Sequence, residues 1–228
     1  MSKSPHCRSP LSCPTSFGLL VALAGPPTLV LISRRAFGDG RSIGVQALLQ
    51  LAFCAFAVIV VFVVIRLERL PLQSIGLRPP SRSTLVSALL LTFILVFLLP
   101  PVTASLVRAL GQEGANAGVA RLAVLPAWFR VFLGATSGVV EETLYRGYAV
   151  ERLAAITGRL WLGAAIATVA FGAAHIPYWG LGFALAADLP VGVVLVLCYV
   201  WRRDLLANMF AHSAALMVAF FTTVPWSV

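Results

Sequence analysis

The sequence predicts an all-α integral membrane protein, a polytopic transmembrane helical bundle of about seven spans (six to eight). Hydrophobic residues make up 60% of the chain, charged residues 11%, and the mean hydropathy is +0.94. Soluble domains average about 45–50% and about 25% for the same two classes. The apolar segments are continuous and close to the length of about 20 residues that a bilayer-spanning helix needs. Barrel strands would be shorter and would alternate in polarity, so a β-barrel is excluded.

Seven apolar segments are expected to form the spans, with ends uncertain by a few residues: 17–33, 45–65, 85–107, 127–150, 160–176, 181–200 and 205–226. The first is short and contains Gly25-Pro26-Pro27. Because proline interrupts a helix, this segment is expected to be kinked or broken. The alternatives for it are a signal-anchor, a re-entrant piece and a true span. Residues 1–16, rich in Ser, Pro and Cys, are expected to be a disordered tail.

The positive charge is distributed over the ends of the apolar segments. The net charge is +9, from 16 arginines and one lysine. This pattern is typical of topology signals and lipid headgroup contacts, so no nucleic-acid partner is expected. Ten basic residues fall on the side of the N-terminus and six on the other, which places the N-terminus in the cytoplasm. The Arg-rich, Lys-poor composition indicates a prokaryotic protein, which is therefore expected in the plasma (inner) membrane.

Two adjacent glutamates, Glu141 and Glu142, lie in the middle of the fourth apolar segment. The chain has only eight acidic residues in 228. Ionisable groups inside a membrane segment are costly and usually face a bundle interior or a wet cavity. The pair therefore indicates a functional site.

The two glutamates are expected to differ in role. Glu142 and Arg146 are four residues apart in the favourable order, which predicts an ion pair. Glu141 points about 100° away and has no local cation, which makes it the better candidate for a general base toward water. Upstream, Gly134 and Gly138 form a small-residue face that allows another helix to approach closely.

Two histidines, His175 and His212, lie in other apolar segments. If the fourth and fifth segments form an antiparallel hairpin that turns at Gly158, Glu141 and His175 lie at the same depth, about 24 Å from the turn. His212 enters from the same side as this turn at a compatible depth. The three side chains are therefore expected to share one site.

These residues resemble the motifs of the CAAX-protease and bacteriocin-processing family, also called the CPBP or Abi family. The first motif, EExxxR, matches Glu141, Glu142 and Arg146; the second, FxxxH, matches Phe171 and His175; and His212 is similar to the histidine of the last motif, HxxxN. The resemblance spans about residues 70–221.

The resemblance implies a metal-independent intramembrane glutamic endopeptidase that uses no cofactor. Its substrate would be a protein or peptide at the membrane. By this resemblance Glu141 activates a water, His175 and His212 assist, and Glu142 and Arg146 orient the site. The protease core would be residues 70–228, preceded by N-terminal transmembrane helices in 17–69. The sequence names neither the substrate nor the oligomeric state.

One motif position departs from the family. Leu216 stands four residues after His212, where the family has an asparagine that would help to stabilise an oxyanion. Leucine cannot donate a hydrogen bond. Asn208, one turn before His212, and Ser213 are the candidate substitutes.

Four alternatives remain open at this stage. A zinc peptidase would use Glu141, His175 and His212 as ligands, although HExxH is absent. A serine mechanism would need Ser137 or Ser213 beside a histidine and an acid. A non-catalytic immunity or scaffold protein is favoured by Leu216. A proton-coupled transporter is the fourth alternative, against which the lack of repeated halves argues.

Overall fold

The computed structural model describes residues 11–38, 42–112, 122 and 124–222, and within these ranges every regular element is helical. The helices follow the seven predicted segments in order. The first three segments form α1 Cys13–Phe37, then α2 Ile43–Phe62 continued by η1 Val63–Leu67, then α3 Arg82–Phe93 continued by η3 Ile94–Leu98 and α4 Leu99–Ala109; a short turn of helix, η2 Leu72–Ile75, lies between the second and the third. The fourth segment forms α6 Ala127–Glu141, η5 Glu142–Val150 and α7 Glu151–Thr157. The last three form α8 Leu160–Trp179, then α9 Leu181–Phe183 continued by η6 Ala184–Asp188 and α10 Leu189–Arg202, and finally α11 Leu205–Thr222.

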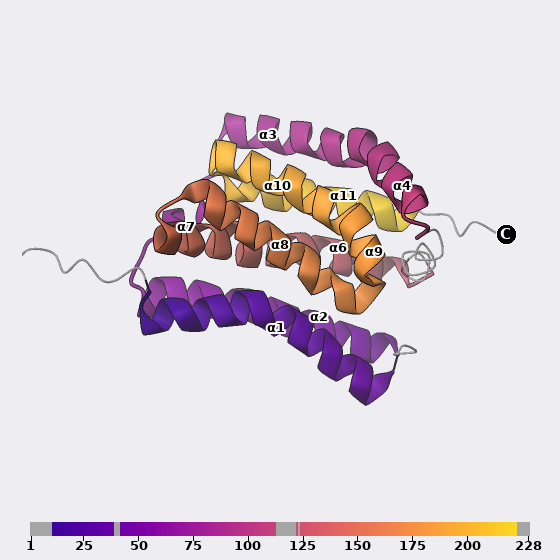
Figure 1. The fold of residues 1–228 in the computed structure, drawn as a ribbon, viewed down its shortest axis with the longest axis horizontal. Coiled ribbons are helices and arrows are strands. Elements are labelled where there is room, and N and C mark those ends of the chain that lie inside the picture. Colours follow the sequence, from indigo (N-terminus) through magenta and orange to yellow (C-terminus); the bar gives the residue numbers. More distant parts are fainter. Residues whose placement is uncertain (1–10, 39–41, 113–121, 123, 223–228) are drawn as a thin grey trace, which may run out of the picture.

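Helix α1 corrects the expected end of the tail and decides between a kinked and a broken first segment. It begins at Cys13, so residues 13–16 are helical and do not belong to a disordered tail; residues 1–10 lie outside the described part of the chain. The Ser12 side chain caps this start by accepting a hydrogen bond from the Thr15 amide. The helix also continues through Pro26 and Pro27 and bends without breaking (Figure 1). The first segment is therefore one continuous helix.

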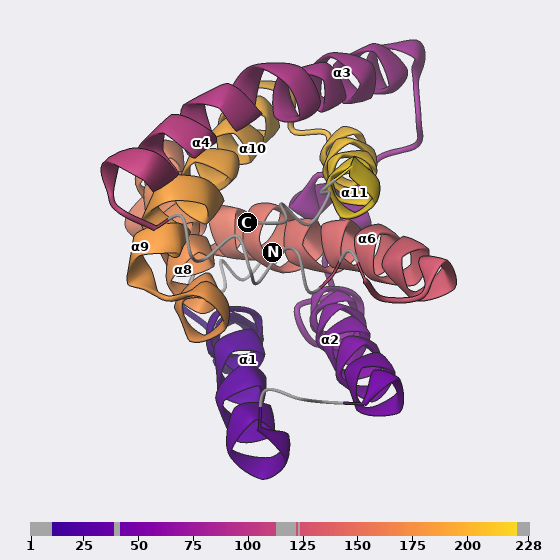
Figure 2. The same ribbon diagram turned by 90° about the vertical axis from the view of Figure 1, so that its right-hand side faces the viewer.

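The bundle is arranged around the long helix formed by α6, η5 and α7. The pair α1 and α2 lies on one side of it, and α3, α4, α10 and α11 lie on the other (Figure 2). Helix α8 runs back antiparallel to α7 after a turn at Gly158, whose φ of 69° suits glycine. This turn is the one that the sequence predicted.

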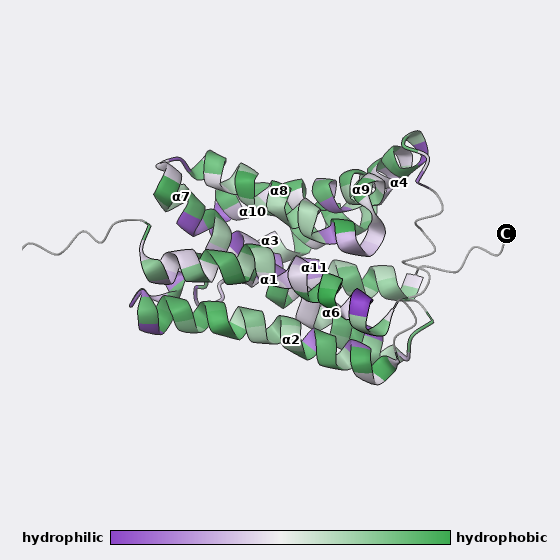
Figure 3. Ribbon diagram, turned by 60° about the horizontal axis from the view of Figure 1, so that its bottom comes forward, coloured by the Kyte–Doolittle hydropathy of each residue, from purple (hydrophilic) through white to green (hydrophobic). Residues whose placement is uncertain are grey.

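Six helical stretches in the described residues are long and apolar enough to cross a membrane: 13–37, 43–67, 82–109, 160–179, 181–202 and 205–222. The α6–α7 helix is absent from this set because it carries the diglutamate and several arginines. It is nevertheless shielded by its neighbours, with Glu142, Arg146 and Tyr148 at 0–1% exposure. Hydrophobic residues predominate along the helices of the bundle (Figure 3). The protein is an integral membrane bundle of about seven crossings.

Two of the π-helical stretches precede prolines. η3 is followed by Pro100 and Pro101, and η6 is followed by Pro190. Because proline lacks an amide hydrogen and its ring crowds the preceding turn, an α-helix before it is disturbed. No proline explains η5, which begins at Glu142, directly after the predicted base. Short π-helical insertions of this kind are frequent at functional sites.

A buried polar cluster attaches the N-terminal helices to the central helix. The Glu68 carboxylate accepts hydrogen bonds from Thr15 Oγ1 at 3.0 Å, Tyr148 Oη at 2.9 Å and Arg152 Nε at 2.9 Å. Its members come from α1, the end of the α2–η1 helix, η5 and α7. Since a buried charge must be paired, this cluster fixes the position of α1 and α2 against the central helix.

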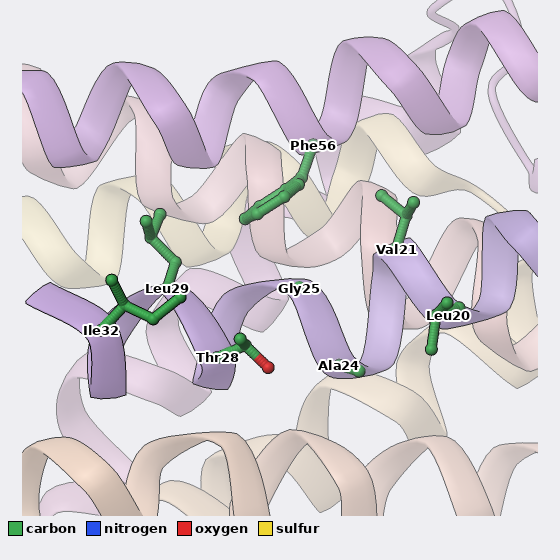
Figure 4. Close-up of a pocket in the computed structure, with 8 residues that line it drawn as sticks. All are labelled: Leu20, Val21, Ala24, Gly25, Thr28, Leu29, Ile32 and Phe56. Atoms are coloured by element: carbon green, nitrogen blue, oxygen red, sulfur yellow. The ribbon is translucent and has the colours of Figure 1, made fainter.

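An open apolar groove of about 430 Å³ lies between α1 and α2 (Figure 4). It is lined by residues of α1 from Leu20 to Ile32 and by Phe56 of α2. The ring of Phe56 packs over Gly25, where an added Cβ would approach it to 3.1 Å. None of the lining residues is ionisable and neither glutamate of the pair lines the groove, so it is separate from the diglutamate.

Candidate active site

The close approach of α6 and α11 brings His212 to the diglutamate. A Cβ added at Gly138 would lie 2.5 Å from the backbone nitrogen of Ser213, and one added at Gly134 would lie 3.2 Å from that of Met217. The separation at Gly138 is shorter than real Cβ atoms show, and the one at Gly134 is tighter than most real contacts. The predicted small-residue face is therefore used, and it allows the α11 backbone to lie directly against α6.

Glu142 is the centre of a fully buried polar network. Its Oε1 accepts from Arg146 Nη1 at 2.9 Å and faces His212 Nδ1 at 3.0 Å, and its Oε2 accepts from Asn208 Nδ2 at 3.0 Å. The predicted Glu142–Arg146 ion pair is thus present, and both of its side chains are no more than 1% exposed. Both carboxylate oxygens are committed, so Glu142 holds its neighbours in place.

Glu141 is the less constrained of the two acids. Its side chain is 25% exposed, and its Oε2 lies 3.8 Å from His212 Nε2. No hydrogen bond to the Glu141 carboxylate occurs among the described residues. A carboxylate that faces an imidazole and remains accessible is able to bind and deprotonate a water.

The rings of both histidines are oriented by contacts at Nδ1. A carboxylate only accepts hydrogen bonds, so His212 donates from Nδ1 to Glu142, which turns Nε2 toward Glu141. His175 donates from Nδ1 to the Phe171 carbonyl at 2.8 Å. Each histidine therefore presents Nε2 as its available nitrogen, and the partner at the other nitrogen fixes the tautomer.

His175 reaches the site less directly than His212. Within the described chain, no hydrogen bond or ion pair joins His175 to Glu141 or to His212. All three lie within electrostatic reach of one group, the carboxylate of Asp188 at the end of η6. Glu141 and His212 are thus in near contact, and His175 is related to them through their shared influence on Asp188.

Phe171 connects the arginine to the second histidine. The Arg146 guanidinium lies over the Phe171 ring at 4.1 Å from its centroid, and the centroid of the His175 ring lies 4.6 Å from that of Phe171. The Phe171 side chain is 2% exposed. A buried cation over an aromatic face is stabilised by the ring quadrupole, so Phe171 supports both neighbours.

The two candidate substitutes for the missing asparagine are engaged elsewhere. Asn208 donates one amide hydrogen to Glu142 and the other to the Leu195 carbonyl at 2.8 Å. The Ser213 hydroxyl donates to the Ala135 carbonyl at 3.1 Å. Asn208 therefore has no hydrogen left for an oxyanion, and its position in the network is a supporting one.

Two residues near Glu141 did not enter the sequence prediction. The Asp188 Oδ2 atom and the Tyr145 hydroxyl are both buried, and neither has a hydrogen-bond partner in the described structure. Both had a signal in the sequence: Asp188 is an acid in an apolar segment, and Tyr145 lies one helical turn after Glu141.

Comparison with known proteins supports the resemblance read from the motifs. Residues 123–218 match the family model described as type II CAAX prenyl endopeptidase Rce1-like. Neither the curated proteins nor the solved structures gave a match. The matched range contains the diglutamate, both histidines and Arg146. The resemblance read from the motifs is thereby confirmed over residues 123–218, which are similar to the Rce1-like group of the CAAX-protease and bacteriocin-processing family.

Proposed function

We propose that the protein is an intramembrane endopeptidase in which Glu141 activates the attacking water. The observation that carries this proposal is the unequal state of the two acids. Glu142 is buried with both oxygens engaged, whereas Glu141 is 25% exposed and faces His212 Nε2 at 3.8 Å. The Rce1-like match supports a membrane protease, and the site supplies the general base.

The hydrolysis would proceed in two steps. Glu141 removes a proton from water while the water oxygen bonds to the scissile carbonyl carbon, which leaves the negative charge on the carbonyl oxygen. When this intermediate collapses, the carbon–nitrogen bond breaks and the leaving amine takes the proton from the Glu141 carboxyl group. His212 and His175 lie at the edge of this region with Nε2 available as an acceptor, and they assist by accepting a hydrogen bond from the attacking water.

The substrate is proposed to be a protein or peptide at the membrane. The site lies between helices of an apolar bundle, so its substrate must enter from the bilayer or its interface. The family description refers to a CAAX prenyl endopeptidase, which makes a prenylated C-terminus one probe. An unprenylated apolar peptide is the second, because the composition predicts a prokaryotic protein for which prenylated substrates are not expected.

The test compares wild type with Glu141→Gln in nanodiscs on internally quenched peptides of both kinds, at equal folded concentration. Glutamine has the same shape but cannot act as a base, so we expect cleavage to fall at least about 100-fold, the lower range for a lost general base. Full cleavage by the glutamine variant would exclude Glu141 as the base. An excess of chelator is included, since retained cleavage argues against the zinc alternative.

A non-catalytic immunity or scaffold role is the second candidate. It is favoured by Leu216, which removes a hydrogen-bond donor from the family's last motif. In that case wild type and Glu141→Gln would support the same cellular phenotype at equal expression, and neither would cleave a peptide. Loss of the phenotype in the glutamine variant alone would favour the protease.

A further inference from the structure

The hydroxyl group of Tyr145 is a buried donor without a partner. The residue is 2% exposed, and its hydroxyl oxygen has no hydrogen-bond partner in the described part of the chain. Tyr148, three residues later, shows the usual state: its hydroxyl donates to Glu68 at 2.9 Å. Since buried tyrosine hydroxyls normally find a partner, the unpaired one at Tyr145 indicates a ligand that is bound only during function.

The position of Tyr145 places this hydroxyl beside the proposed base. Tyr145 follows Glu141 by four residues and so lies on the same face of the helix. Its hydroxyl is within electrostatic reach of the Glu141 carboxylate. The Tyr145 ring also packs edge-on against Phe171 at 5.3 Å, and Phe171 in turn packs against His175. Tyr145 therefore contacts Phe171, the neighbour of the second histidine, from the helix face that carries Glu141.

Few other donors are available for an oxyanion at this place. Asn208 gives both amide hydrogens to Glu142 and Leu195. The Ser213 hydroxyl is bonded to a backbone carbonyl. Arg146 donates to Glu142 and to the Gly192 carbonyl at 3.3 Å. Among these side chains only the Tyr145 hydroxyl makes no hydrogen bond in the described part of the chain.

We propose that Tyr145 is a further catalytic residue, whose hydroxyl donates a hydrogen bond to the oxyanion formed on the scissile carbonyl. The inference rests on the proposed protease function. The phenol is neutral and keeps its proton throughout, so the group stabilises charge without any transfer of its own. A fixed donor in a site poor in water is effective because it needs no reorganisation when the charge develops.

The test is Tyr145→Phe in the full chain, assayed in nanodiscs on whichever of the two peptide probes wild type cleaves. Removal of one oxyanion donor typically lowers kcat by about 10²- to 10³-fold, and KM should stay within about threefold. Tyr148→Phe is the matched control, because it removes a buried hydroxyl from the same helix. It should melt at a lower temperature but keep kcat within about threefold.

A peptide aldehyde of the cleaved probe, which forms a tetrahedral hydrate, gives a second readout. Its inhibition constant should rise in Tyr145→Phe by about the factor that kcat/KM falls, as expected for a group that contacts the tetrahedral state. A folded Tyr145→Phe with near wild-type kcat, or one with an unchanged inhibition constant, would overturn the inference while the base role of Glu141 stands. Absence of cleavage by wild type, or full cleavage by Glu141→Gln, would instead overturn the proposed function and this inference with it.

Discussion

The substitution Glu142→Gln should destabilise the protein far more than Glu141→Gln, although the two residues are adjacent. Glu142 pairs with Arg146 at 2.9 Å, and both side chains are at most 1% exposed. Loss of one partner from such a pair leaves an uncompensated buried charge, which costs about 3–5 kcal/mol. Glu141 is partly exposed and has only the 3.8 Å approach to His212, so Glu141→Gln should cost less than about 1 kcal/mol.

Thermal and denaturant unfolding in one detergent, followed by tryptophan fluorescence, would measure this difference. Glu142→Gln should also lower kcat of the folded fraction by about 10- to 100-fold, because His212 loses the partner that orients its ring. Adding Arg146→Met to Glu142→Gln should recover at least about 1 kcal/mol, since the unpaired cation is then removed. Equal stability of the two glutamine variants would refute the assignment of Glu142 as the centre of the buried network.

Three further predictions concern other contacts. Gly138→Val should abolish cleavage and lower the melting temperature, because an added Cβ would lie 2.5 Å from the Ser213 backbone and force α6 and α11 apart. A folded, active variant would contradict the close approach of these two helices. Glu68→Gln should lower the free energy of unfolding by about 3–5 kcal/mol, because it leaves Arg152 without its counter-charge. The kcat of the folded fraction should stay within about threefold of wild type. An unchanged free energy of unfolding would contradict the role of Glu68 in attaching the N-terminal helices to the central helix. Leu216→Asn, which restores the family residue, should raise kcat by about tenfold in the peptide assay by adding a second donor, and no gain would show that this position does not face the oxyanion.

The order and length of the helices were predictable because each span needs about 20 apolar residues. The turn at Gly158 was predictable from a glycine between two such segments. The start of α1 at Cys13 was missed, since a Ser, Pro and Cys composition resembles a tail although Ser12 forms a helix cap. For the segment with Pro26 and Pro27 the sequence left a kinked and a broken helix open, and the structure has one continuous, bent helix, because neighbouring helices support a helix that proline alone would weaken.

At the site, local spacing predicted the Glu142–Arg146 pair, but contacts between distant segments were outside its reach. The hydrogen bonds of Asn208 to Glu142 and of Tyr148 to Glu68 join residues 66 and 80 positions apart. Depth along the helices predicted that Glu141 and His212 would lie at a similar level, and the Gly138 contact brings them together. Rotation about each helix axis decides which atoms meet, and one sequence leaves that rotation undetermined.

The central claim is that Glu141 acts as a base toward water and not as a nucleophile. A single turnover of the cleaved probe in water enriched in oxygen-18, analysed by mass spectrometry of both peptide product and protein, tests it directly. Direct attack by water predicts one oxygen-18 atom in the new carboxyl terminus and none in the peptide that contains Glu141. An unlabelled product together with label in the Glu141 peptide would show a covalent intermediate and would contradict the account.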